Sequence, residues 1–172
     1  MPDLLISVHP LYANLIATGE KIWELRKEAP GLAVDGAWIY STTARNDRER
    51  SVPHRAIVAK AKIGAIVKDS ATNIWKGNLE LGNPAQISKA YFDAYFKGRK
   101  TAVAIVLTEV IKVHIPLEAI RKVVPHFHPP QGHVYLNQDT PLLSLFLEES
   151  QVAEREESFD RLKKEINFGV CA

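Results

Sequence analysis

The segment AIVAKAKIGAIVK, residues 56–68, decides the fold class because apolar and polar residues alternate along most of its length. A period of two is typical of a half-buried β-strand. At about 3.3 Å per residue this strand would extend roughly 40 Å, so it must curl to fit a small domain. Gly64 predicts a bend or bulge in it. One face is predicted to carry Ile57, Ala59, Ala61, Ile63, Ala65 and Val67.

A second segment, residues 101–115, shows the same alternation with Glu109 as the exception. Its in-phase residues are Val103, Ile105, Leu107, Ile111, Val113 and Ile115. Two long, curling, half-buried strands predict a small β-barrel that closes on itself.

Shorter elements surround these two strands. Residues 4–8, 21–27, 36–42 and 133–136 read as strands, and Pro10 and Gly19 delimit a helix between the first two. Ser88 and Gly98 mark the start and the end of another predicted helix. It carries an aromatic stripe of Tyr91, Phe92, Tyr95 and Phe96. We expect this stripe to close one end of the barrel, with base stacking as the less favoured alternative.

The C-terminal segment is predicted to be helical from Thr140, an N-cap before Pro141. Its apolar face consists of Val152, Phe159, Leu162 and Ile166. The sequence thus predicts an α+β fold in two parts, a barrel domain at residues 1–137 and a helical extension at residues 138–172.

Composition narrows the class of protein. The 172 residues, 46% of them hydrophobic, suit one globular domain. The single cysteine, Cys171, excludes an internal disulfide, and no signal peptide or membrane span is recognisable, so we expect a cytoplasmic protein. Residues 1–147 carry a net charge of +5 and residues 148–172 one of −3, which weakly favours a polyanionic partner.

The strand GEKIWELRK, residues 19–27, is unusually charged. By strand parity Trp23 and Leu25 face the core, whereas Glu24 and Arg26 share the other face with Lys21 near its start. A guanidinium held by a carboxylate can present its remaining donors to a phosphate or a base edge. The alternative is a solvated ion pair worth about 0–1 kcal/mol.

The pattern G-x-K-x-x-E-x-R formed by Gly19, Lys21, Glu24 and Arg26 resembles the signature of the ASCH domain family of PUA-like β-barrels. The segments SVHP, IYST, FDAYFKGR and PPQGHVYL also resemble a bacterial and phage subgroup, so that the resemblance covers about residues 4–136. The resemblance implies a charged cleft that binds RNA or a nucleotide, and a regulatory role in transcription or translation.

Some members of this family are enzymes, which implies an alternative function. One branch deacetylates N4-acetylcytidine with a lysine, a threonine and a glutamate, and ribonuclease activity is attributed to another. Lys21 matches the lysine, but Glu24 occupies the position of the threonine, and no residue aligns with the family's glutamate. A carboxylate near Lys21 is expected to keep it charged, which favours binding over chemistry. If the protein is a hydrolase, Lys21 and Glu24 are its candidate catalytic residues.

Further residues are candidates for the rim of the cleft. Tyr40 and Ser41 end the third predicted strand, and the next loop carries Arg45, Arg48, Arg50 and Arg55. A solvated, self-paired loop is the alternative reading. His9 and Tyr12 open the first helix and either face the cleft or serve capping and packing. His126, His128 and His133 lack recognisable ligand spacing, so we predict neither a metal site nor a cofactor.

These observations predict a binding module in which Lys21, Glu24 and Arg26 form the cleft, for a single-stranded RNA or a modified base. The first alternative is a hydrolase of RNA or of an acylated nucleoside. The second alternative is an interaction module that works through its C-terminal helix. Oligomeric state does not follow from the sequence.

Overall fold

The computed structural model describes the backbone of residues 1–169 and the side chains of residues 1–164, so that Cys171 and the side chain of Ile166 lie outside it. The fold is mixed α+β, as predicted, with six strands in one sheet. The strands are β1 (Asp3–Val8), β2 (Trp23–Arg26), β3 (Gly36–Ser41), β4 (Ala56–Ser70), β5 (Thr101–Pro116) and β6 (His133–Leu136). The helices are α1 (Pro10–Ala17), α2 (Asp47–Arg50), α3 (Ala71–Glu80), α4 (Lys89–Tyr95), α5 (Leu117–Val123) and α6 (Pro141–Gly169).

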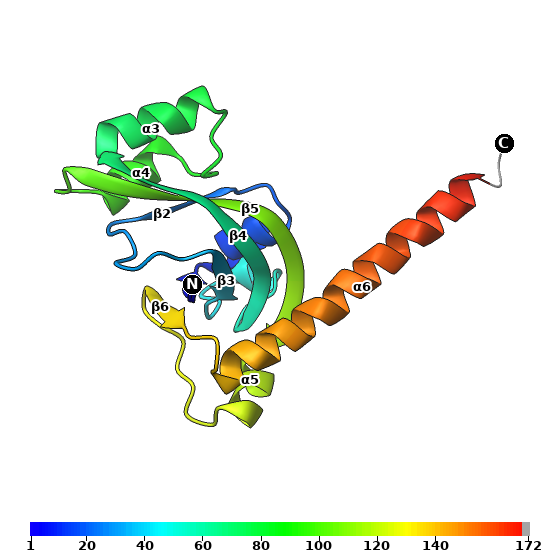
Figure 1. The fold of residues 1–172 in the computed structure, drawn as a ribbon. Helices are drawn as coiled ribbons and strands as arrows, with labels where there is room; N and C mark the ends of the chain where they lie inside the picture. The colour runs from blue at the N-terminus through cyan, green and yellow to red at the C-terminus, as the bar shows by residue number, and fades with distance from the viewer. Residues whose placement is uncertain (170–172) are drawn as a thin grey trace.

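The sheet has the strand order β2-β5-β4-β3-β1-β6 and is strongly curved (Figure 1). All pairs are antiparallel except β1 with β3. Within residues 1–169 the two end strands, β2 and β6, each pair with one neighbour, so the sheet stays open where the sequence predicted a closed barrel. The curl was predicted correctly, because it follows from the length and bulges of β4 and β5.

The long strands change phase at their bulges. The register of β4 against β5 shifts between Ile63 and Ala65, around Gly64. Because an extra residue reverses which side faces inward, Ile66 packs against the core after this point whereas Val67 is 42% exposed. The prediction that Ala65 and Val67 continue the buried face was therefore wrong. Glu109, the exception in the β5 pattern, has a φ of +47°. It lies where the register of β5 shifts against Lys60 and Lys62 of β4.

Three groups of buried side chains stabilise this arrangement. The first lies between α1 and the sheet and includes Ile16, Ile39 and Ile105. The second lies beneath α5 and the start of α6, where Trp38 contacts Phe146. The third lies beneath α3 and α4. These two helices stand at the other end of the curved strands from α5 (Figure 1).

Helix α6 packs through its first turns and then projects from the body of the molecule (Figure 1). Thr140 Oγ1 accepts a hydrogen bond from the backbone of Leu143 at 3.3 Å, as expected for an N-cap. Leu142, Leu143 and Phe146 are buried in the second group. The division at residue 138 remains a prediction, and the start of this extension belongs to the core. None of the helices within residues 1–169 has the length and apolar character needed to cross a bilayer.

Candidate functional site

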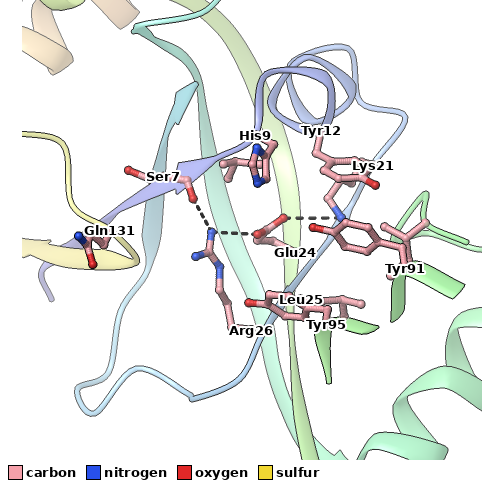
Figure 2. A pocket seen from close by; sticks show the side chains of 12 residues that line it. Ser7, His9, Tyr12, Lys21, Glu24, Leu25, Arg26, Tyr91, Tyr95 and Gln131 are labelled. Carbon is pink, nitrogen blue, oxygen red and sulfur yellow. Dashed lines mark hydrogen bonds and ion pairs between the residues drawn. The ribbon is translucent and has the colours of Figure 1, made fainter. Parts of the chain in front are cut away.

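A pocket of about 260 Å³ opens beside the C-terminal end of β1, between β2 and α4. The positive φ of Gly19, +78°, ends α1 and turns the chain back into β2. Figure 2 shows the side chains that line the pocket. They are Ser7, Val8, His9, Tyr12, Lys21, Glu24, Leu25, Arg26, Ile87, Tyr91, Tyr95 and Gln131.

Lys21 is anchored at the inner end of this pocket and is only 2% exposed. Its ammonium donates to the backbone oxygens of Trp23 and Ala85, each at 2.7 Å. It also lies 3.6 Å from Glu24 Oε2. These three partners match the three protons of an ammonium group. Lys21 therefore positions Glu24 and joins β2 to the segment before α4.

Glu24 and Arg26 extend the same chain of contacts across the pocket (Figure 2). Arg26 Nη2 lies 2.9 Å from Glu24 Oε1 and donates to the backbone oxygen of Ser7 at 2.9 Å. Trp23 and Leu25 pack in the hydrophobic core. Alternation along β2 thus separates core from pocket residues as predicted, although Leu25 also reaches the pocket wall. The Arg26 guanidinium spans the gap between β2 and β1.

Two buried polar atoms of the pocket residues have no hydrogen-bond partner among the described residues. They are Ser7 Oγ and Arg26 Nε. A buried donor or acceptor left unpaired costs about 1–3 kcal/mol, so native proteins rarely retain one without a reason. The hydroxyl accepts or donates a hydrogen bond and the Nε group donates one. An ordered water or a polar ligand that reaches these atoms would satisfy both.

The walls of the pocket are aromatic. Tyr12 and Tyr91 meet edge to face with ring centroids 5.4 Å apart, and Tyr91 stacks with Tyr95 at 6.2 Å. The aromatic stripe of α4 therefore divides. Phe92 and Phe96 pack in the core, whereas Tyr91 and Tyr95 face the pocket, which corrects the expectation that the whole stripe closes the fold.

Burial sets the protonation of these side chains. It lowers the pKa of Lys21, and the neighbouring positive charge of Arg26 lowers it further, although Glu24 partly opposes the shift. The sequence argument that Glu24 keeps Lys21 charged therefore omitted the larger effect. Burial raises the pKa of Tyr12 and Tyr91, so both hydroxyls remain hydrogen-bond donors at neutral pH.

A second, more open hollow adjoins the first. It shares Ser7, His9 and Gln131 with the pocket. Its other lining residues are Tyr40, Thr42, Thr43, Arg45, Arg55, Leu117, Arg121, Pro129 and Pro130. His9 faces both cavities, and its side chain makes no capping hydrogen bond to α1.

The remaining predicted rim residues lie elsewhere. Ser41 is fully buried and donates to the backbone oxygen of Pro53 at 2.7 Å, and it does not line the pocket. Arg48 is exposed on α2, and its charge influences Tyr12. Arg50 pairs with Asp47 at 2.5 Å. Lys21, Glu24, Arg26 and His9 are thus brought together, Tyr40 and Arg45 adjoin them, and Ser41, Arg48 and Arg50 do not line either cavity.

Sequence reasoning missed Ser7 and Gln131, and it gave Tyr91 and Tyr95 a role towards a ligand only in the less favoured alternative. For the tyrosines a signal existed in the sequence. Tyr91 and Tyr95 are spaced i, i+4, and Phe92 and Phe96 form the next such pair, so the hydroxylated rings and the apolar rings lie on neighbouring faces of one helix. No comparable signal marked Ser7. Within residues 1–169 no three His, Cys, Asp or Glu side chains lie close enough together to hold a metal ion.

Comparison with known proteins supports the family resemblance. The sequence profile of the ASCH domain family matches residues 6–122, which confirms the predicted family. An ASCH domain-containing ribonuclease from Zymomonas mobilis is 27% identical over 139 residues, covering 80% of this chain and 86% of the relative.

Solved structures agree with this result. The crystal structure of ASCH from Zymomonas mobilis has a TM-score of 0.70 at 27% identity, covering 83% of this chain and 94% of that one. A serine-to-alanine variant of the Zymomonas mobilis protein has a TM-score of 0.72 at 25% identity, covering 86% of this chain and 98% of that one.

Proposed function

This chain belongs to the ASCH domain family, and from that premise we propose that it binds single-stranded RNA or a nucleotide through the pocket of Lys21, Glu24 and Arg26. The observation that carries the proposal is the tyrosine-walled pocket of ionic side chains, two of whose lining residues, Ser7 and Arg26, each keep a buried polar atom without a partner among the described residues. A base has a flat π-face for the rings and polar edges for these atoms.

The size and charge of the pocket support the same ligand. A volume of about 260 Å³ lies just below the roughly 300–1,000 Å³ typical of small-molecule sites, which suits one base or nucleoside. An intact duplex cannot enter such a pocket, whereas an unstacked base can. The Arg26 guanidinium, which is always charged at physiological pH, favours an attached phosphate.

The test compares two serines. Ser7→Ala removes a hydroxyl that has no partner among the described residues, so we expect unchanged stability and about fivefold to tenfold weaker binding of single-stranded RNA by fluorescence anisotropy. Ser41→Ala removes the hydrogen bond to Pro53, so it should lower stability by about 1 kcal/mol and leave affinity unchanged.

A double variant provides the stronger test. Lys21→Ala with Arg26→Ala removes both cations of the pocket and should abolish binding, with circular dichroism as the check on folding. If this folded variant, or folded Ser7→Ala, binds RNA and nucleosides as well as the natural protein, the proposal fails.

A second candidate is RNA hydrolysis, which the named activity of the Zymomonas mobilis relative favours. In this scheme the 2′-hydroxyl attacks phosphorus while Glu24 accepts its proton, and the bond to the leaving 5′-oxygen breaks as Lys21 donates a proton to it. The lowered pKa of Lys21 makes that donation easier. Incubation with labelled RNA and with N4-acetylcytidine tests both hydrolase readings. No product in either assay excludes them, and product that persists in Glu24→Gln and Lys21→Met excludes this mechanism.

The remaining features are parts of the same proposal. We propose residues 1–137 as the ligand-binding domain, with a barrel-like curl, and residues 138–172 as its helical extension. An interaction role for α6 is the other alternative, since Val152, Phe159 and Leu162 are exposed along it. A cytoplasmic location is proposed on the cysteine content and the lack of a recognisable targeting segment, and a role in regulating transcription or translation on the family resemblance.

A further inference from the structure

The second hollow is distinguished by its arginines. Arg45, Arg55 and Arg121 line it, and no acidic side chain is among its lining residues within the described part of the chain. They come from three separate segments: the loop after β3, the residue before β4, and α5. Arginine is always charged at physiological pH and presents several donors to a phosphate. The hollow therefore has the chemistry of an anion site.

Most side-chain donors of these arginines have no hydrogen-bond partner in the part of the chain that the structure describes. Arg121 Nε donates to the backbone oxygen of Phe127 at 3.3 Å, which fixes the side chain and leaves its terminal nitrogens. Arg55 forms an exposed ion pair with Glu118 at 3.0 Å. The Arg45 backbone amide, and not its guanidinium, contacts Glu49. The three guanidinium groups are thus held at the hollow while several of their N–H donors remain available to a ligand.

Arg55 also occupies an unfavourable backbone position. Its φ is +51°, in the left-handed region that favours glycine. Hydrogen bonds to the backbone of Thr42, at 3.2 Å, and of Leu117, at 2.8 Å, hold it there. Non-glycine residues in such conformations concentrate at functional sites.

The hollow adjoins the pocket. Ser7, His9 and Gln131 belong to the lining of both. A nucleotide in the pocket would therefore have its neighbour along the strand directed past His9 and Gln131 towards the arginines.

Building on the proposed function, we propose that Arg45, Arg55 and Arg121 form a subsite for the backbone phosphate of the nucleotide that adjoins the one in the pocket. The ligand is accordingly an RNA strand, not a free nucleotide. Arg26 and the tyrosines hold one base, and the three arginines hold the phosphate beside it.

The experiment compares the four nucleoside 5′-monophosphates with mixed-sequence RNA tetranucleotides by isothermal titration calorimetry. The natural protein should bind the tetranucleotides at least about tenfold more tightly than the best monophosphate. Arg45→Ala and Arg121→Ala should each weaken tetranucleotide binding about tenfold and leave monophosphate binding unchanged. Each should also reduce the magnitude of the slope of log K against log salt concentration by about 0.7. Arg161→Ala, which removes an arginine on α6 away from both cavities, should change neither affinity.

Arg55→Gly adds a test that misfolding cannot imitate. It relieves the positive φ, so the variant should be at least as stable as the natural protein while it binds tetranucleotides more weakly. If Arg55 is purely structural, loss of its ion pair with Glu118 would leave RNA affinity intact.

The outcomes separate this inference from the proposed function. Equal affinity for monophosphates and tetranucleotides, or equal weakening of both by the arginine variants, overturns the subsite and leaves the pocket. If the natural protein binds neither ligand, the proposed function falls and the subsite falls with it.

Discussion

The ammonium of Lys21 donates to the backbone oxygen of Ala85 at 2.7 Å, across 64 positions of sequence. This bond ties the start of β2 to the segment between α3 and α4. Asn78, on α3, is fully buried, and its Oδ1 accepts from the backbone of Ala85 at 2.9 Å. The ionic pocket therefore depends on a helix that contributes no residue to its lining.

Replacement of Asn78 by alanine should destabilise the protein by about 1–3 kcal/mol, because the buried amide of Ala85 loses its acceptor. Urea denaturation measures this loss. Asn73→Ala is the matched control on the same helix, since Asn73 is exposed and should change stability by no more than about 0.5 kcal/mol. Equal effects of the two variants would contradict the anchoring role of Asn78.

The pKa of Lys21 should respond to its two ionic neighbours in opposite directions. Glu24 raises this pKa and Arg26 lowers it, so Glu24→Gln should lower it further and Arg26→Met should raise it. Side-chain NMR titration of Lys21 measures both shifts. A pKa at or above the ordinary value of 10.5 in the natural protein would contradict the dominance of burial.

The same shift predicts a pH dependence of stability. Because the folded pKa of Lys21 lies below its unfolded value of 10.5, the unfolded state binds more protons between the two values. The stability of the natural protein relative to Lys21→Met should therefore rise as pH increases through this window. Denaturation of both proteins from pH 7 to 10.5 checks the sign, and a difference that falls with pH would contradict it.

Loss of the Tyr91 ring should weaken RNA binding with little effect on folding. Tyr91 is 39% exposed, so Tyr91→Leu removes little core packing. If a base stacks on the ring, the loss is about 1–3 kcal/mol, or roughly 5-fold to 150-fold in affinity. Tyr91→Phe keeps the aromatic face and should bind within about threefold of the natural protein. Weak binding by Tyr91→Phe would point to the hydroxyl in place of stacking.

Helix α6 should divide into an essential and a dispensable part. Removal of residues 156–172 should leave the melting temperature nearly unchanged, because, among the side chains of α6 that the structure describes, the buried ones lie before this point. Phe146→Ala should cost about 3–5 kcal/mol, since Phe146 is fully buried against Trp38. If removal of residues 140–172 leaves a fully stable protein, the start of α6 is not part of the core.

Alternation and capping signals predicted most strands and the ends of the main helices correctly. They predicted a closed barrel where the sheet stays open, because whether end strands meet depends on their partners and not on their own period. They also misassigned Val67, because the bulge at Gly64 reverses the parity of every later residue in β4.

The site was only partly predictable for a related reason. Glu24 and Arg26 are local in sequence, so parity sufficed to place them on one side of β2, whereas Lys21 precedes the strand and was placed beside them by its position after Gly19. Ser7 and Asn78 act through contacts with distant segments, and no local pattern in the sequence carries that information.

Strand β5 contributes side chains to all three hydrophobic groups, for example Ala104 to one, Leu107 to another and Ile115 to the last. Because β5 belongs to all three groups, local unfolding at one end of the molecule should also disrupt the strand that the other end packs against. Amide exchange along this strand should therefore proceed only through global opening. A destabilising substitution anywhere in β5 should affect both the tyrosine-walled cavity and the packed N-terminal turns of α6.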